Sequence, residues 1–309
     1  MTEHYVTLFD SLFLPQGLAL HTSMERHLSN FTLWIVCVDD EAFVALQRLN
    51  LNHVRLLQLS KLETPELLSV KSRRDKGEYC WTVTPFAPRF VFEADADVQR
   101  VTYLDADIWF RDNPNAIFDE FEASRKAVLI TEHAFAAEHD HSAISGKFCV
   151  QFIIFKRGDS EDVRNKWAQQ CLEWCSSQPE DGKFGDQKYL DDWPRDFKNQ
   201  VHILQNKELC LGPWNVMRFP YSNAVFYHFS GLRLVSPQKL TLGDYPIPRV
   251  VLVNVYRPYS KDIRSAVGAL MDIGFHCRPQ QKTVSKLSAL KAAIRNFRRK
   301  FIPKTSIKF

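Results

Sequence analysis

Two aspartates separated by one residue, Asp105 and Asp107, are the part of this sequence best suited to chemistry. They follow a short apolar run, Val101–Leu104, whose residues favour a strand. Since residues i and i+2 of a strand point to the same side, both carboxylates can reach one cation where the strand ends. Carboxylate oxygens suit Mn²⁺ or Mg²⁺, ions that commonly also hold a substrate's phosphates. The pair therefore predicts a metal and phosphate site, although aspartate is also common in ordinary turns.

Polar side chains in three later clusters could complete such a site. Asp186 and Gln187 lie in a stretch with two glycines, where we expect them to face a polar ligand, although Asp186 could instead cap a helical turn. The pair Trp214–Asn215 follows a Gly-Pro turn. His228 ends an apolar stretch before a Ser-Gly turn. It is either a core histidine or the imidazole that would join two carboxylates on a metal.

The elements that must position these residues alternate between strand and helix in the first half of the chain. Strands are expected over 5–9, 31–38, 53–57 and 101–104, helices over 16–28 and 41–49, and a mostly helical stretch over 65–92 broken at Pro85 and Pro88. The second half is less regular, with strands expected over 127–131, 148–155, 201–204 and 224–229, a helix over 163–175, and a short helix or turn over 185–190. This alternation predicts an α/β fold with a mainly parallel sheet flanked by helices. Ligands bind beyond the carboxyl ends of such strands, where Asp10, Asp39 and Asp105 would lie.

The composition indicates a globular, cytoplasmic protein and excludes several other classes. The 309 residues suffice for one large domain, and the hydrophobic fraction of 45% and charged fraction of 25% are ordinary for a globular protein. A net charge of +4 is too small to indicate a nucleic-acid partner. The seven cysteines are irregularly spaced and contain no Cys-x-x-Cys pair, so they indicate neither a zinc site nor a disulfide framework. We therefore expect the protein in a reducing cytosol. With neither a signal peptide nor an apolar run near the ~20 residues of a membrane span, we expect a cytoplasmic protein.

The end of the chain differs in composition from the rest. Nine basic and no acidic residues follow Gln280, and apolar residues recur there at helical spacing. We therefore expect a catalytic domain over 1–275 and a basic amphipathic tail over 276–309. Such a tail is a candidate for lying on an anionic membrane surface at the inner face of the cell membrane. A terminal helix packed on its own domain and a flexible tail are the alternatives.

Taken in order, these clusters resemble the motifs of the retaining nucleotide-sugar glycosyltransferases with the GT-A fold. The resemblance is to the family-eight type, which includes glycogenin-like and bacterial lipopolysaccharide glycosyltransferases, and it runs from about residue 5 to 233. That family's Tyr-Leu-Asp-x-Asp segment resembles Tyr103–Asp107, and its Asp-Gln-x-x-Leu segment resembles Asp186–Leu190. Its Trp-Asn pair resembles Trp214–Asn215, and its metal-binding His with a following Gly resembles His228 with Gly231.

The resemblance implies a hexosyltransferase that moves a sugar from a UDP-sugar to an acceptor hydroxyl with retention of configuration. It implies Mn²⁺, or Mg²⁺, held by Asp105, Asp107 and His228. The residues implied to contact the nucleotide sugar are Thr7, Phe9, Asp10, Tyr103, Asp105, Ala106, Asp107, Trp214, Asn215, Gly231 and Arg233. Asp186, Gln187 and Gln151 are the implied catalytic residues, with front-face attack on the anomeric carbon and the leaving phosphate taking the acceptor proton.

The sequence departs from the family pattern in three places. In the first strand, Thr7–Asp10 stand where the family has polar residues that contact the nucleotide base. Gln151 stands where the family usually has an Asn-x-Gly turn, so a sugar or acceptor contact there would fall to Gln151 or be missing. Arg233 stands in place of a lysine that follows the metal-binding histidine, and Arg73 or Arg74 could add charge at the phosphates.

Two other functions remain open from the sequence. A sugar nucleotidyltransferase would share the sheet and the carboxylates, but such enzymes usually carry a Gly-rich basic loop after the first strand. Residues 12–17 have one glycine and no lysine or arginine, which argues against that function. A non-catalytic sugar-nucleotide-binding protein is the second alternative. For a cytoplasmic enzyme with a basic tail, we expect a saccharide or lipid-linked saccharide acceptor and a role in cell-envelope polysaccharide or glycolipid synthesis.

Overall fold

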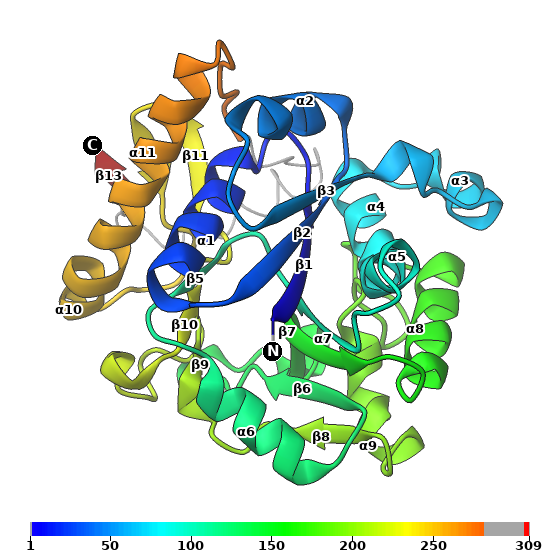
Figure 1. The fold of residues 1–309 in the computed structure, drawn as a ribbon. Helices are drawn as coiled ribbons and strands as arrows, with labels where there is room; N and C mark the ends of the chain where they lie inside the picture. The colour runs from blue at the N-terminus through cyan, green and yellow to red at the C-terminus, as the bar shows by residue number, and fades with distance from the viewer. Residues whose placement is uncertain (1, 281–305, 309) are drawn as a thin grey trace.

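A seven-stranded sheet forms the centre of the protein in a computed structural model that describes residues 2–280 and 306–308 (Figure 1). The strand order is β3-β2-β1-β4-β7-β6-β8. Neighbouring strands run parallel except at β7, which is antiparallel to both β4 and β6. The strands are β1 Glu3–Phe9, β2 Phe31–Cys37, β3 Val54–Gln58, β4 Arg100–Leu104, β6 Val128–Glu132, β7 Phe148–Lys156 and β8 Val201–Ile203. The expected mainly parallel α/β sheet is confirmed.

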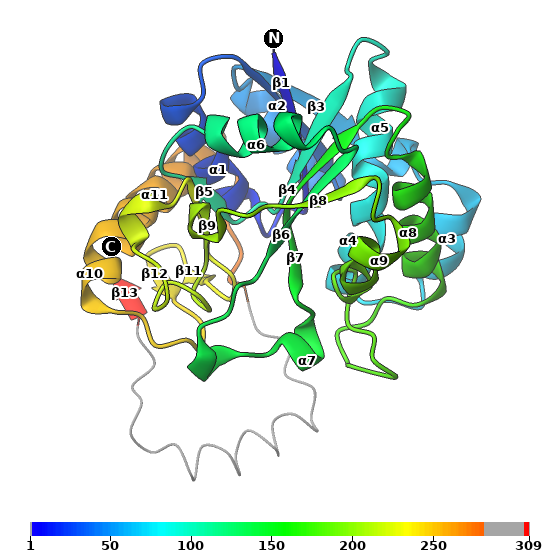
Figure 2. The same ribbon diagram turned by 90° about the horizontal axis from the view of Figure 1, so that it is seen from below.

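Helices cover both faces of this sheet, which is seen between them in Figure 2. One face carries α1 Leu14–His27, α2 Asp40–Leu49, α6 Asn115–Ser124 and α11 Arg257–Asp272. The other carries α3 Pro65–Lys71, α4 Lys76–Val83, α5 Ala87–Ala94, α8 Glu161–Glu173 and α9 Trp193–Asp196. The shorter helices are α7 Ser142–Ser145 and α10 Arg249–Val251, which runs through a π-helical turn, Leu252–Tyr256, into α11.

Strand β1 shows how the sequence divides the core between these two faces. Its side chains alternate, so Val6 and Leu8 join the apolar cluster under α4 and α5, whereas Tyr5 and Phe9 join the cluster under α1 and α2. At its end Phe9 packs on Gly17 of α1, where an added Cβ would lie 2.4 Å from the ring. The absent side chain of Gly17 thus lets α1 approach the end of the strand from which Asp10 follows.

Two smaller sheets lie beside the central one. The first pairs β5 Ile108–Phe110, β10 Phe226–His228 and β9 Cys210–Leu211; the second pairs β11 Arg233–Ser236, β12 Lys239–Thr241 and β13 Ser306–Lys308. Aromatic side chains pack them against α11, with Phe229 stacked on Tyr259 at a ring-centre distance of 3.6 Å. Helix α11 also lies along α1, so this region is fixed to the central layer (Figure 1).

The secondary structure differs from the expectation in a few places. Helices α6 and α11 were not predicted. Pro88 lies in the first turn of α5 rather than breaking a helix, and the break is the 3₁₀ turn Thr84–Phe86. The short helix expected over 185–190 is a 3₁₀ turn at Lys188–Asp192.

Most of the expected basic tail, residues 281–305, lies outside the described residues, so the predicted amphipathic helix remains a prediction. At the end of the tail, Ser306–Lys308 form the strand β13 along β12. None of the helices in residues 2–280 or 306–308 has the length and apolar character needed to cross a bilayer.

Candidate metal and donor site

Asp105, Asp107 and His228 come together beyond the carboxyl end of β4. One ligand atom from each residue lies within 4.8 Å of the others. The His228 Nε2 atom is 3.0 Å from Asp107 Oδ1 and 3.7 Å from Asp105 Oδ2. Two carboxylate oxygens and one imidazole nitrogen match the ligand preferences of Mn²⁺ and related divalent cations. Among the described residues this is the single group that could hold a metal ion.

Strand pairing accounts for the meeting of residues so far apart in sequence. Directly after Asp107 the chain forms β5, which pairs antiparallel with β10 so that His228 lies opposite Ile108. The Phe229 amide donates to the Asp107 carbonyl at 2.9 Å, which extends this pairing to the metal site. The register of two short strands therefore sets the imidazole beside the carboxylates.

Buried groups behind the triad orient its side chains. The His228 Nδ1–H donates to Gln151 Oε1 at 3.0 Å, which leaves Nε2 facing the two carboxylates. The Tyr103 hydroxyl donates to Asp105 Oδ1 at 3.0 Å. Gln151 is fully buried, and its backbone carbonyl accepts from the Asp105 amide. The Gln151 oxygen thus pairs with the imidazole, and the expected sugar or acceptor contact of Gln151 stays a prediction.

The two aspartates have opposite pKa shifts in the metal-free protein. Burial, together with the charge of Asp107 and against that of His228, raises the pKa of Asp105 to about 7. Burial also raises the pKa of Asp107, but the charge and hydrogen bond of His228 outweigh it, so that pKa lies below its usual range. Burial acts to lower the pKa of His228, yet the charge and hydrogen bond of Asp107 hold it well above its ordinary value. A divalent cation would relieve this crowding of carboxylates.

A buried cysteine lies against the back of the same imidazole. Cys149 precedes Gln151 by two residues in β7, so both side chains project from one face of the strand. Burial raises the pKa of the Cys149 thiol, but the neighbouring His133 and His228 outweigh it and lower the pKa to about 6. Sequence inspection singled out neither Cys149 nor His133, because an isolated cysteine in an apolar strand looks like a small core residue.

Asp186 is buried near Asp105. Burial, and then the charge of Asp105, raise the pKa of Asp186 well above its ordinary value. Its backbone carbonyl accepts from Trp167 Nε1 at 2.8 Å, which fixes the segment on α8. Gln187 follows it and is half-buried just before the 3₁₀ turn. The buried carboxyl of Asp186 therefore lies close enough to Asp105 for their charges to interact, and the catalytic roles of Asp186 and Gln187 stay predictions.

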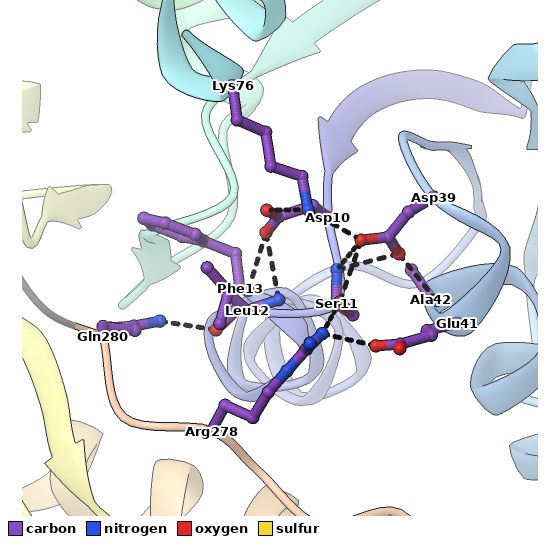
Figure 3. A network of polar contacts seen from close by, with 10 residues as sticks. All are labelled: Asp10, Ser11, Leu12, Phe13, Asp39, Glu41, Ala42, Lys76, Arg278 and Gln280. Atoms are coloured by element: carbon purple, nitrogen blue, oxygen red, sulfur yellow. Dashed lines mark hydrogen bonds and ion pairs between the residues drawn. The ribbon is translucent and has the colours of Figure 1, made fainter.

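A second polar cluster forms where β1 and β2 end (Figure 3). The Lys76 Nζ atom is 2.8 Å from Asp10 Oδ2 and 2.9 Å from Asp39 Oδ2, and half of the lysine side chain is exposed. The other Asp10 oxygen accepts from the Leu12 and Phe13 amides, as a turn aspartate does. Asp39 caps α2 through the Ala42 amide. Lys76 was not predicted, although its place after Asp75 marks the start of a helix with a capping box.

Arg233 lies close to both clusters. Its positive charge lowers the pKa of Asp107, and its guanidinium lies 5.4 Å from the centre of the Phe13 ring. Gly231, two residues earlier, has a φ of +80°, so a turn in the left-handed conformation that favours glycine leads into Arg233. Ala106, between the two metal-site aspartates, is buried.

Four residues predicted to contact the nucleotide are buried in the structure. The Thr7 side chain in β1 is fully buried, and the Phe9 ring packs on α1. Trp214 lies edge-on to the His228 ring with centres 5.3 Å apart, and its indole N–H donates to the His133 carbonyl at 2.8 Å. The Asn215 amide accepts from Gly212 N and donates to the carbonyls of His133 and Cys210. The polar atoms of Trp214 and Asn215 thus bond to backbone groups beside the site, and contacts of these four residues with a nucleotide stay predictions.

The two arginines suggested as extra phosphate ligands also lie elsewhere. Arg73 is exposed on the surface after α3. The Arg74 guanidinium donates to the Leu172 and Cys175 carbonyls at 2.8 and 2.6 Å. It thus satisfies the carboxyl end of α8, where a cation is favoured by the helix dipole. Within the described residues, Arg233 is the arginine whose charge acts on the metal-site residue Asp107.

Comparison with known proteins gives two relatives and a fold. No protein-family model matches the sequence. The chain is 32% identical over 254 residues to YfnF of Bacillus subtilis (strain 168), covering 76% of this chain and 84% of that protein. It is 27% identical over 285 residues to YfnD of the same organism, covering 85% of this chain and 89% of that protein. Both relatives are themselves uncharacterized.

Solved structures resemble the model at low sequence identity. The galactosyltransferase LgtC, solved with donor and acceptor sugar analogs, superposes with a TM-score of 0.53 at 15% identity, covering 85% of this chain and 95% of LgtC. The glycosyltransferase GlyE of Streptococcus pneumoniae TIGR4 also gives 0.53, at 17% identity, covering 93% of this chain and 67% of GlyE. The fold of this chain is therefore the GT-A fold of glycosyltransferases, as the motifs predicted.

Proposed function

We propose that this chain, which belongs to the same protein family as YfnF of Bacillus subtilis and has the GT-A fold, is a metal-dependent glycosyltransferase. Its donor would be a UDP-sugar, its acceptor a hydroxyl group, and its outcome retention of the anomeric configuration. The observation that carries the proposal is the meeting of Asp105, Asp107 and His228 at the carboxyl edge of the sheet. Ligands of such sheets bind at that edge.

The residues present fit a divalent cation. Asp105, Asp107 and His228 would hold Mn²⁺ or Mg²⁺, with Gln151 and Tyr103 orienting two of these ligands. Such second-layer hydrogen bonds are a usual accompaniment of metal-binding histidines and carboxylates. When bound, the ion would neutralise charge on the donor's diphosphate. The two buried carboxylates support this role, because a bound cation would offset their negative charge.

The donor would extend from the metal triad toward the end of β1. Arg233, whose charge lowers the pKa of Asp107, would add a charge-assisted contact to a phosphate. The Asp10, Asp39 and Lys76 cluster offers oxygen and nitrogen groups for a ribose or a base, with Lys76 half-exposed. A uridine at this end is our proposal, carried by the resemblance together with the polar edge of β1 and β2.

The chemistry proposed for the chain's own residues is positioning and charge stabilisation. The bond between the anomeric carbon and the phosphate oxygen breaks, a bond from that carbon to the acceptor oxygen forms on the same face, and the acceptor proton passes to the leaving phosphate. Positive charge develops on the sugar during this exchange, as in glycoside hydrolysis. Asp186 would hold sugar hydroxyls, and the neighbouring Gln187 would orient the sugar.

The acceptor and the location of the protein are proposed from the resemblance and from the basic residues near the end of the chain. We propose a saccharide or lipid-linked saccharide acceptor and a role in making a cell-envelope polysaccharide or glycolipid in the cytoplasm. The basic residues after Gln280 support a location at an anionic membrane surface, and vesicles with and without anionic lipid would test it by cosedimentation. Equal binding to both vesicle types would contradict the membrane proposal.

A donor screen tests the function directly. Purified protein is incubated with Mn²⁺ and a set of UDP- and GDP-sugars, and nucleoside diphosphate release is measured. We expect slow release from at least one UDP-sugar, because water replaces the missing acceptor. No release from any donor, with tight binding of UDP retained, would favour the non-catalytic sugar-nucleotide-binding protein.

Paired variants connect that activity to the metal site. We expect Asp105→Ala to remove metal-dependent turnover while the fold is kept. Asp112→Asn, at an exposed aspartate just beyond β5, is the matched control and should keep full activity. Full activity in Asp105→Ala would refute the assignment of the metal ligands.

A further inference from the structure

The segment 278–280 crosses the turn that follows β1 and contacts both sides of the candidate donor site (Figure 3). Its last residue, Gln280, is only 4% exposed although it carries a polar amide. Such burial is costly unless the amide is hydrogen bonded. The partners of Gln280 therefore indicate what the residue holds in place.

Every hydrogen-bonding position of the Gln280 amide is used. Its oxygen accepts from Gln16 Nε2 at 2.9 Å and from the Leu234 amide at 2.8 Å. Its nitrogen donates to the Leu12 carbonyl at 2.5 Å and to Gln16 Oε1 at 3.1 Å. The backbone amide of Gln280 also donates to the Leu234 carbonyl at 2.8 Å. An amide has two donors and two acceptor positions, so none is left for another partner.

These partners belong to two different parts of the donor site. Leu12 lies in the turn held by Asp10, whose Oδ1 accepts from the Leu12 amide at 3.0 Å. Leu234 directly follows Arg233 in β11. The ring of Phe13, in the Asp10 turn, also faces the Arg233 guanidinium. Gln280 thus joins the Asp10 turn and the Arg233 strand, which are more than two hundred positions apart in the sequence.

A second and weaker contact comes from the same segment. Arg278 donates to Ser11 Oγ at 2.8 Å and forms an ion pair with Glu41 of α2. Ser11 is in turn held by Asp39, which also contacts Lys76 (Figure 3). Because Arg278 and Glu41 are both more than half exposed, this pair contributes little, and the buried amide is the main connection.

We propose that Gln280 is a positioning residue that fixes the Asp10 turn and Arg233 relative to each other before the nucleotide donor binds. The inference rests on the proposed function, since it concerns the same donor site. A fully satisfied buried polar network makes its surroundings rigid. A site fixed in advance loses less entropy when its ligand binds, so the effect of Gln280 is on nucleotide affinity. Gln280 touches no reacting atom.

The test compares Gln280→Met with a control at the same residue type. Methionine keeps the volume and burial of the side chain but removes its hydrogen bonds. Gln238→Met, at the exposed turn between β11 and β12, is the control. We expect Gln280→Met to bind UDP in Mn²⁺ on the order of tenfold more weakly than wild type. Binding of Mn²⁺ without nucleotide should stay unchanged, because the metal triad lies on other strands.

Amide hydrogen exchange gives a second readout that does not depend on nucleotide. In Gln280→Met we expect faster exchange at Leu12, Phe13 and Leu234, whose amides lie on the two joined segments. Unchanged exchange at these amides would overturn the positioning role, whatever the protein binds. Weaker binding of Mn²⁺ itself would also overturn it, because the defect would then be general.

These outcomes separate the inference from the proposed function. If the wild type binds no UDP in Mn²⁺, the proposed donor is wrong, and hydrogen exchange still decides the role of Gln280. If the wild type binds UDP and Gln280→Met binds equally well, the positioning role is wrong. Should Gln280→Met fail to fold, Gln16→Met replaces it, because it removes two of the four hydrogen bonds of the Gln280 amide, and a smaller loss of UDP affinity is expected. Unchanged affinity in Gln16→Met would then overturn the role of Gln280.

Discussion

Replacing Gln151 by methionine should weaken metal binding without touching a metal ligand. Gln151 Oε1 accepts the His228 Nδ1–H at 3.0 Å, and the residue is fully buried, so water has no access to replace it. Without this acceptor, the neutral imidazole is free to keep its proton on Nε2, the atom needed for the metal. Nε2 lies 3.0 Å from Asp107, which would hold that proton in place.

The size of the effect can be worked out from these contacts. The other hydrogen bond of the Gln151 amide, to Thr131 Oγ1, is 3.5 Å long and contributes little. The loss therefore falls on His228, where an unpaired buried donor costs about 1–3 kcal/mol. Loss of a residue behind a metal ligand typically lowers metal affinity by about 10–100-fold, or about 1.4–2.7 kcal/mol. We expect Gln151→Met to bind Mn²⁺ more weakly by a factor in that range.

Titration of Mn²⁺ followed by electron paramagnetic resonance, which detects the free ion, measures this affinity. Methionine preserves the volume of the buried side chain, so thermal unfolding should show a folded protein. Gln99→Met, at an exposed glutamine before β4, is the matched control and should bind Mn²⁺ as the wild type does. An unchanged Mn²⁺ affinity in Gln151→Met would refute the role of Gln151 in orienting His228.

Three further predictions concern the pH dependence and the packing around the site. Mn²⁺ affinity should fall as the pH drops below about 7, because Asp105 and His228 must both lose a proton to bind metal. The pKa of Asp105 is raised to about 7, and that of His228 is raised well above its ordinary value. Titrations of Mn²⁺ at pH 6, 7 and 8 would measure this dependence, and an affinity that does not change with pH would contradict it. Asn215→Ala should lower the free energy of unfolding, measured by urea denaturation, by about 2–4 kcal/mol. The substitution removes the side-chain partners of the buried Gly212 amide and Cys210 carbonyl. A loss below about 0.5 kcal/mol would show that these hydrogen bonds do not stabilise the protein. Gly17→Ala should destabilise the protein by about 1–3 kcal/mol, because its Cβ would meet the Phe9 ring. Gly268→Ala in α11, where an added Cβ would have nothing within 4 Å, should stabilise the protein by up to about 1 kcal/mol. Equal shifts of the unfolding temperature in the two variants would contradict this account.

The central fold was predictable because its signals are local. Apolar runs ending in aspartate marked β1, β2 and β4, and their alternation with helices gave the parallel part of the sheet. Helix α11 was missed although its buried residues Tyr259, Ile263, Val267 and Leu270 recur at helical spacing. That signal was available, and the irregular composition of the second half of the chain obscured it.

The metal triad was predictable, whereas the support around it was not. Spacing alone placed Asp105 and Asp107 together, and the resemblance added His228. The direction of a loop side chain cannot be read in the same way. Asn215 and Trp214 occupy the expected place in the sequence, yet their polar atoms bond to the backbone behind the site. Lys76 and Gln280 act through contacts with distant elements, for which the sequence carries no local pattern.

The central claim is that Asp105, Asp107 and His228 hold a metal that binds the diphosphate of a nucleotide donor. Isothermal titration of UDP into the protein, with Mn²⁺ and with chelator, tests it most directly when wild type and Asp107→Asn are compared. We predict that UDP binds the wild type only with Mn²⁺ and that Asp107→Asn loses this binding. Equal UDP affinity with and without Mn²⁺, or an unchanged affinity in Asp107→Asn, would contradict the claim.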